Sequence, residues 1–173
     1  PTRTYHDPHA KPEILVALRT TWALAGFRTG DDAAGRLVDA GGAAAELAGA
    51  AAGRPDARDA FVALLRSDGD RRRALAAVAA ATTGSGDDDD PATWVGRLAE
   101  AYPGDPTALA PLVLDLIRLE PWQAVFLSAG VPHAYLRGAG VELMAASDNV
   151  VRGGLTPKHV DVDELLALLA APG

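Results

Sequence analysis

The stretch Ser128–Val160, SAGVPHAYLRGAGVELMAASDNVVRGGLTPKHV, predicts strands joined by tight turns. Its apolar pieces, HAYL and VELMAAS, are separated by the glycine-rich segment GAG (138–140), which favours a turn. Single charged or titratable residues stand among these small neutral neighbours: His133, Glu142, Asp148, Arg152 and Lys158. Two explanations compete for this pattern. The residues are either scattered charges at strand ends or the lining of a polar pocket inside a β-barrel.

The start of the chain predicts a further strand. EILVAL (Glu13–Leu18) is a short apolar run with branched residues behind Pro12, which favours an extended conformation. The following TTWALAGF (20–27) is expected to form one or two helical turns. Near the other end, QAVFLS (123–128) predicts a strand, and a helix is expected from about Asp163.

The middle of the chain, from Gly30 to Leu119, predicts helices throughout. Apolar residues recur there at helical spacing, including in DPTALAPLVLDLIRLE (105–120). The acidic run Asp87–Asp90 precedes Pro91, and a helix N-terminus favours negative charge, so this run predicts a solvated cap and not a binding site. Strands therefore flank a helical block. We expect an α+β fold, in which one β domain is interrupted by an inserted helical domain.

Composition excludes several classes of protein. The chain has 173 residues and a net charge of −7, which argues against a nucleic-acid partner. No apolar run is long enough to cross a bilayer, so no membrane partner is expected. Cysteine is absent, which excludes disulfides and thiolate metal sites and suits a cytoplasmic protein.

Two residues are candidate metal ligands. SAGVPH (128–133) is similar to half of a cupin motif, in which a glycine turn delivers a histidine into a small barrel. Glu13 begins an apolar strand and shares a strand face with Leu15 and Ala17. A core histidine and a solvent-facing strand end are the alternatives. If Glu13 and His133 meet, they supply half of a four-ligand zinc site.

Taken together, three strings resemble the type I phosphomannose isomerases: YHDPHAKPE (5–13), ALAGFR (23–28) and FLSAGVPHAYLRGAGVELMAASDNVVRGGLTPK (126–158). The resemblance covers about residues 1–28 and 120–164. It implies a zinc-dependent cupin (jelly-roll) barrel with an inserted helical domain, which interconverts mannose 6-phosphate and fructose 6-phosphate. The implied partner is a small sugar phosphate, and the implied full-length protein is a monomer.

The resemblance also implies roles for individual residues. Glu13 and His133 match two zinc ligands, while the other two, in a Gln-x-His string, belong to a strand upstream of Pro1. This chain is therefore expected to be a piece of the family's protein that lacks two of its four ligands.

The implied catalytic residues are Lys11, Asp148 and Arg152, and the implied substrate-binding residues are Glu142 and Lys158. Ala10 stands where the family has a histidine, which leaves the acid–base residue open.

The predicted domain limits are 1–28 for the first cupin segment, 29–119 for the inserted helical domain and 120–173 for the remaining cupin strands and the last helix. Two other functions stay open. The chain is alternatively a non-catalytic module that binds a metal or a sugar phosphate, or a helical interaction scaffold. A Gln-x-His string in the full gene product would favour the isomerase.

Overall fold

The computed structural model describes residues 9–147, 150–156 and 160–170. Its strands are β1 (Glu13–Ala17), β2 (Thr21–Phe27), β3 (Leu114–Leu119), β4 (Ala124–Leu127), β5 (His133–Arg137) and β6 (Gly140–Met144). Its helices are α1 (Gly30–Ala40), α2 (Gly42–Ala45), α3 (Ala48–Ala51), α4 (Arg58–Leu65), α5 (Gly69–Ala81), α6 (Pro91–Ala101), the 3₁₀ helix η1 (Pro106–Leu112) and α7 (Val162–Ala170).

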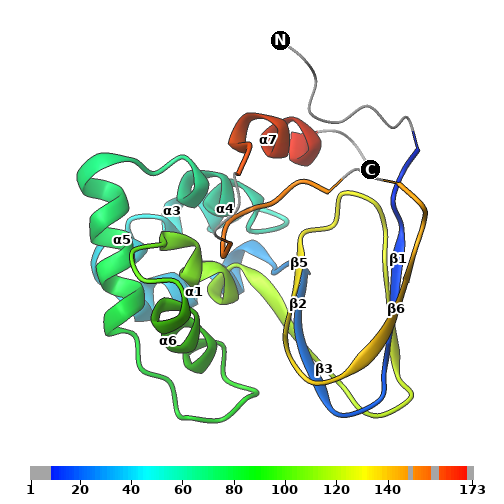
Figure 1. The fold of residues 1–173 in the computed structure, drawn as a ribbon. Coiled ribbons are helices and arrows are strands. Elements are labelled where there is room, and N and C mark those ends of the chain that lie inside the picture. The colour runs from blue at the N-terminus through cyan, green and yellow to red at the C-terminus, as the bar shows by residue number, and fades with distance from the viewer. Residues whose placement is uncertain (1–8, 148–149, 157–159, 171–173) are drawn as a thin grey trace.

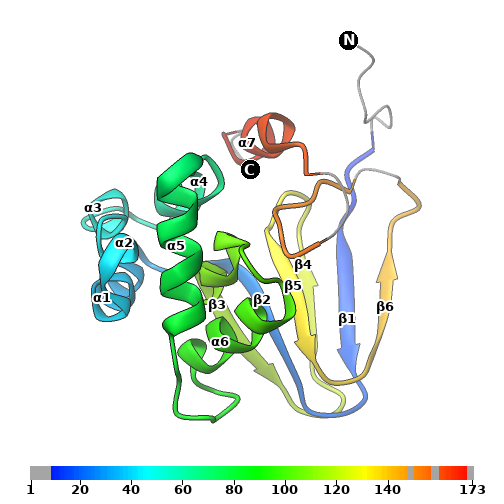
Figure 2. The same ribbon diagram turned by 60° about the vertical axis from the view of Figure 1, so that its left-hand side comes forward.

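The strands form two antiparallel sheets of three strands each, in the orders β4-β1-β6 and β3-β2-β5. Helices α1 to α6 and η1 all lie between β2 and β3 in the sequence, and these two strands are hydrogen-bonded neighbours. The chain thus leaves the sheet after β2 and returns beside it as β3. The helices gather next to the β3-β2-β5 sheet, with β1 and β6 on the far side (Figures 1 and 2).

Strand β1 follows the alternation that its sequence predicts. Leu15 and Ala17 point inward and are buried. Ile14 faces the other way, between Phe126 of β4 and Leu143 of β6. Phe126 and Leu143 are both largely exposed, so this outer sheet face is apolar. The strand therefore presents its Glu13 face to the interior between the two sheets.

Two predicted helical segments are wrong. TTWALAGF forms strand β2, because its Thr, Trp and Phe residues suit a sheet and both of its edges are paired. The segment 105–120 forms η1 and then β3. Pro111 lies inside this segment, and proline removes a helical hydrogen bond and clashes with the preceding turn. The chain therefore returns to the sheet before residue 119.

The other predicted helices are confirmed as α1, α4, α5, α6 and α7. Phe61, Leu64 and Leu65 lie together on the buried face of α4, as their spacing predicts. They belong to one apolar core that also contains Leu24 of β2 and Leu165 of α7. This core joins the helices to the sheet beside them. Among the described residues, no helix has the length and apolar character that crossing a membrane requires.

Arg28 joins the helices to the sheet at the point where the chain leaves β2. Its buried guanidinium donates to Asp32 at 2.9 Å and to the carbonyl oxygen of Pro111 at 3.3 Å. It also lies 3.8 Å from the carboxylate of Asp115 in β3. The first turn of α1, the end of η1 and the start of β3 are thereby held together.

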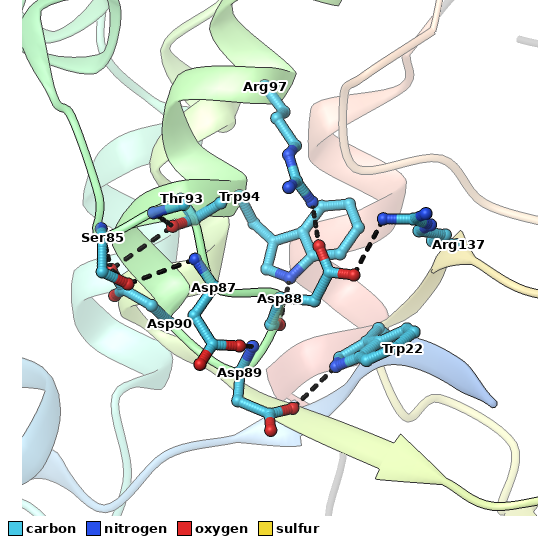
Figure 3. A network of polar contacts seen from close by, with 11 residues as sticks. Trp22, Ser85, Asp87, Asp88, Asp89, Asp90, Thr93, Trp94, Arg97 and Arg137 are labelled. Atoms are coloured by element: carbon cyan, nitrogen blue, oxygen red, sulfur yellow. Dashed lines mark hydrogen bonds and ion pairs between the residues drawn. The ribbon is translucent and has the colours of Figure 1, made fainter.

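The acidic run before α6 does more than cap the helix. Asp90 is the N-cap and accepts a hydrogen bond from the backbone N–H of Ala92, as predicted. Asp88 and Asp89, however, contact side chains of the β3-β2-β5 sheet (Figure 3). The prediction of a purely solvated cap is therefore wrong for these two residues, because cations of the sheet lie opposite them.

Candidate metal and substrate site

A cavity of about 610 Å³ opens where strand ends from both sheets meet. Glu13 is the first residue of β1, and its neighbours across the sheet are Leu127 and Met144, the last residues of β4 and β6. His133 is the first residue of β5, in the other sheet. The antiparallel order therefore brings residues from distant parts of the sequence to one end of the two sheets.

One wall of the cavity is polar and the other is apolar. The polar wall includes Lys11, Glu13, His133, Tyr135 and Glu142. The apolar wall is formed by α4, η1 and α7. It includes Phe61, Ala110, Leu165, Leu168 and Leu169. Helix α7 lies at this end of the sheets in both views (Figures 1 and 2). Such a mixture of a few convergent polar groups with apolar walls is typical of a small-molecule site.

His133 and Glu13 are in contact. The Nε2 atom of His133 lies 3.1 Å from Oε2 of Glu13. Its Nδ1 atom lies 3.0 Å from the carbonyl oxygen of Val131, which can only accept a hydrogen bond. Nδ1 therefore carries a proton, and in a neutral imidazole Nε2 then has a lone pair that faces a carboxylate. Two acceptors face each other unless a proton or a metal ion lies between them.

Glu142 of β6 completes a set of three potential ligands. One ligand atom from each of Glu13, His133 and Glu142 lies within 4.8 Å of the other two. The hydroxyl of Tyr135 donates to Oε1 of Glu142 at 2.6 Å and so links the two sheets. Burial, together with this hydrogen bond and the charge of Glu142, raises the pKa of Tyr135. Tyr135 therefore stays a hydrogen-bond donor at neutral pH.

Lys11 lies beside this set, with its Nζ atom 3.9 Å from Oε1 of Glu13. Both side chains are only 12% exposed. His9 and Ala10 also line the cavity. The residues His9, Ala10, Lys11 and Glu13 therefore all line the cavity, and the catalytic role of Lys11 stays a prediction.

Comparison with known proteins gives a consistent result. The mannose-6-phosphate isomerase of Escherichia coli (strain K12) is 38% identical over 169 residues, which cover 95% of this chain and 42% of that protein. The protein of the same name from Salmonella typhimurium is 39% identical over the same shares. The chain thus spans less than half the length of these curated relatives. No protein-family model matches it.

Solved structures of proteins with these names are similar to this chain as well. A mutant phosphomannose isomerase from Salmonella typhimurium superposes with a TM-score of 0.78 and 35% identity, over 95% of this chain and 43% of that one. A mannose 6-phosphate isomerase solved with bound zinc gives a TM-score of 0.74 and 32% identity, over 96% of this chain and 43% of that one.

This chain is homologous to the type I mannose-6-phosphate isomerases.

The structure does not test the roles of three residues that the resemblance to these isomerases singles out. Asp148 and Lys158 lie outside the described residues. Arg152 is half-buried in a segment whose Val151, Gly153 and Gly154 line the cavity, but Arg152 itself does not line it. Its role stays a prediction.

Tyr135 is the residue that sequence reasoning missed. It stands two positions after His133 in the same strand, and strand residues two apart share a face. Once His133 is taken as a candidate ligand, this spacing alone places Tyr135 toward the same site. The contact with Glu142 depends on the pairing of β1 with β6, which no local pattern specifies.

Proposed function

We propose that this chain forms part of a mannose-6-phosphate isomerase, an enzyme that interconverts mannose 6-phosphate and fructose 6-phosphate with the help of zinc. One observation carries the proposal. Nε2 of His133 and Oε2 of Glu13 face each other at 3.1 Å, in a cavity of about 610 Å³. The homology to isomerases, one of which was solved with zinc, supports the same conclusion.

The donor set fits zinc. Zinc takes histidine nitrogen and carboxylate oxygen at about 2.0–2.2 Å in tetrahedral geometry, so two of its ligands stand about 3.4 Å apart. The observed distance of 3.1 Å between Nε2 and Oε2 is close to that separation. The carbonyl oxygen of Val131 fixes the His133 tautomer, as partners of metal-bound histidines do. Glu13 and His133 would hold the ion.

The reaction moves a proton between adjacent carbons of the sugar through an enediol intermediate. When bound, zinc would polarise oxygens of the substrate. Glu142 and Lys158 would bind the sugar phosphate, and Lys11 would add positive charge beside Glu13. Tyr135 would keep the Glu142 carboxylate oriented through its 2.6 Å hydrogen bond. Arg152 would hold the phosphate or the intermediate, with Asp148 orienting its guanidinium.

The fold proposal is a cupin domain with an inserted helical domain, predicted at the limits 1–28, 29–119 and 120–173. Because β3 (Leu114–Leu119) belongs to the sheet, the helical part ends earlier, with η1 at Leu112. The arrangement of the strands supports this proposal, because β1, β4 and β6 belong to one sheet while β2, β3 and β5 belong to the other. The position of seven helices between the neighbouring strands β2 and β3 supports the insertion.

The test is an assay of the full-length protein with mannose 6-phosphate, combined with measurement of its metal content. We expect turnover that requires zinc. Glu13→Gln should lose both zinc and turnover, because it removes a charged ligand. Glu100→Gln on the exposed face of α6 is the matched control and should keep both. Zinc binding without turnover would favour the binding module, and absence of both would refute the proposal.

A further inference from the structure

One row of side chains crosses the β3-β2-β5 sheet. Trp22 in the central strand β2 pairs with Arg118 of β3 on one side and with Arg137 of β5 on the other. Residues paired in this way across a sheet stand side by side on one face. The row therefore presents an indole N–H between two guanidinium groups.

Two consecutive aspartates lie opposite this row (Figure 3). Asp89 accepts from Nε1 of Trp22 at 2.7 Å and from Arg118 at 3.1 Å. Asp88 accepts from Arg137 at 2.8 Å. The acidic run thus contacts the sheet at two places. Asp89 bonds to side chains of β2 and β3, and Asp88 bonds to a side chain of β5.

Asp88 is itself firmly fixed on the helical side. Its carboxylate also accepts a hydrogen bond from Arg97 of α6, and its backbone carbonyl accepts one from Nε1 of Trp94 at 2.7 Å. The Asp88 side chain is only 15% exposed, whereas that of Arg137 is 62% exposed. Arg97 lies over the ring of Trp94, 4.6 Å from the ring centroid. Asp88 is therefore a rigid anchor for whatever it holds.

Strand β5 contains an irregularity next to Arg137. Ala23 pairs with Tyr135, but the preceding residue Trp22 pairs with Arg137, so one step along β2 matches two steps along β5. The extra residue is Leu136. Such a bulge moves the following side chain to the opposite face of the strand.

The bulge separates two functions along β5. His133 and Tyr135 point toward Glu13 and Glu142 in the cavity. In a regular strand Arg137, two residues after Tyr135, would share their face. Because of the bulge it instead reaches Asp88 on the face that packs against the helices.

We propose that the ion pair between Asp88 and Arg137 fixes the register of β5 and thereby positions His133 and Tyr135 in the site. Strand β5 is an edge strand among the described residues, paired with β2 alone. Among the described residues, backbone pairing therefore sets its register from the β2 side alone. A slip that removed the bulge would turn side chains to the wrong face. No hydrogen bond or ion pair among the described residues joins Asp88 or Arg137 to His133 or Tyr135, so they are positioning residues.

The expected change in zinc affinity rests on the proposed function, whereas the expected change in amide hydrogen exchange does not. The test compares Arg137→Gln with Arg118→Gln in the full-length protein. The two arginines flank the same tryptophan and pair with adjacent aspartates, and each substitution removes one positive charge. Of the two arginines, only Arg137 lies in β5. The readouts are the dissociation constant for Zn²⁺, measured against a competing chelator, and amide hydrogen exchange of the metal-free protein.

We expect Arg137→Gln to weaken zinc binding by clearly more than the twofold limit set for Arg118→Gln, because the ligand His133 is then less well positioned, and to speed exchange across 133–137. Asp88→Asn should act in the same direction, and the double variant should be no worse than the single ones. Arg137→Lys, which keeps the charge, should restore part of the affinity. Arg118→Gln should leave zinc affinity within about twofold of the wild type.

Equal effects of Arg137→Gln and Arg118→Gln on both readouts, or unchanged exchange across 133–137 in Arg137→Gln, would overturn the inference. If the wild-type protein binds no zinc, the proposed function fails. The exchange measurement still decides whether Asp88 and Arg137 hold β5, because it needs no metal.

Discussion

Nε2 of His133 lies 3.1 Å from Oε2 of Glu13, although the two residues are 120 positions apart in the sequence. The contact crosses from one sheet to the other, since Glu13 begins β1 and His133 begins β5. The helices between β2 and β3 account for most of the intervening chain. The site therefore depends on the correct pairing of strands that are separated in the sequence by a long helical segment.

The first prediction concerns metal removal. If zinc bridges Glu13 and His133, it binds the folded protein and stabilises it by mass action, by about 2.7 kcal/mol at a free concentration 100 times the dissociation constant. Thermal unfolding of the full-length protein, with zinc and with chelator, should show this difference. His133→Ala should abolish this stabilisation by zinc. Glu100→Gln, which changes an exposed residue of α6, should retain it. An undiminished zinc effect in His133→Ala would contradict the assignment.

The second prediction concerns the link between the sheets through Tyr135. Tyr135→Phe removes the hydrogen bond to Glu142, and hydrogen bonds to charged groups contribute about 1.5–3 kcal/mol. Because the residue is 40% exposed, water replaces part of this bond, and we expect a loss of about 1 kcal/mol. Urea unfolding measures it. Tyr102→Phe is the control, since no hydrogen bond of its hydroxyl occurs among the described residues. An equal loss in both variants would show that the Glu142 bond adds nothing.

Much of the fold could be predicted from local patterns. The apolar spacing in α4 and the alternation in β1 each predict one apolar face, and in the structure that face is buried. The two failures have different causes, since Pro111 is a local signal in 105–120, whereas nothing local decides TTWALAGF. An apolar run such as TTWALAGF suits a short helix or a strand equally, and only pairing partners decide between them. Those partners, β3 and β5, lie far away in the sequence.

The candidate site was predictable in part for the same reason. His133 and Glu142 stand as single charged or titratable residues among small neutral neighbours, and Glu13 opens an apolar strand, which indicates all three without any knowledge of their partners. Tyr135 carries no such mark, because a tyrosine in a strand is ordinary. The contacts of Asp88 were likewise hidden, since the row of cations that it meets is assembled only by the sheet.

The third prediction concerns acid stability. The hydrogen bond from Trp22, and then that from Arg118, hold the pKa of Asp89 below its ordinary value of 3.8. A carboxyl with a lowered folded-state pKa adds stability above its ordinary pKa and loses it as the pH falls through the lowered value. The difference in unfolding free energy between wild type and Asp89→Asn should therefore be constant above about pH 5 and shrink as the pH falls below the ordinary pKa of the carboxyl.

A matched variant checks the cause of this effect. Trp22→Phe removes the first donor to Asp89 while leaving the carboxylate in place, so it should shrink the acid dependence that Asp89 contributes. If Trp22→Phe preserves the full difference between Asp89 and its asparagine variant at every pH, the hydrogen bond is not the source.

The fourth prediction concerns the turn between β5 and β6. Gly138 has a φ of 133°, and an added Cβ would lie 2.6 Å from the Cα of Thr21, which cannot move aside. Gly138→Ala should therefore destabilise the protein by about 3 kcal/mol, from strain and overlap together. Gly130→Ala is the control, with a φ of 81° but open space around it. It should cost about 1 kcal/mol from strain alone. Equal losses in denaturant unfolding would refute the role of the contact with Thr21.

The last prediction concerns Arg152. This residue lies four positions after Asp148 and next to Gly153 and Gly154, which line the cavity. A guanidinium is a planar fork that can hold a carboxylate on one side and a phosphate or enediolate oxygen on the other. Lysine keeps the charge but cannot make both contacts. Loss of one such charge-stabilising donor typically lowers turnover by about 10²–10³, and we expect this loss in Arg152→Lys.

The competing role for Arg152 is purely structural, as a partner of Asp148 at the rim of the sheets. In that case Arg152→Lys should lower the melting temperature and leave turnover per folded molecule nearly unchanged. Both quantities are therefore measured on the same preparation of the full-length variant, with the folded fraction determined independently. Normal turnover with a lowered melting temperature would exclude the catalytic role. A normal melting temperature with turnover reduced at least a hundredfold would establish it, because a guanidinium that only braces the fold has no means of acting on the reaction alone.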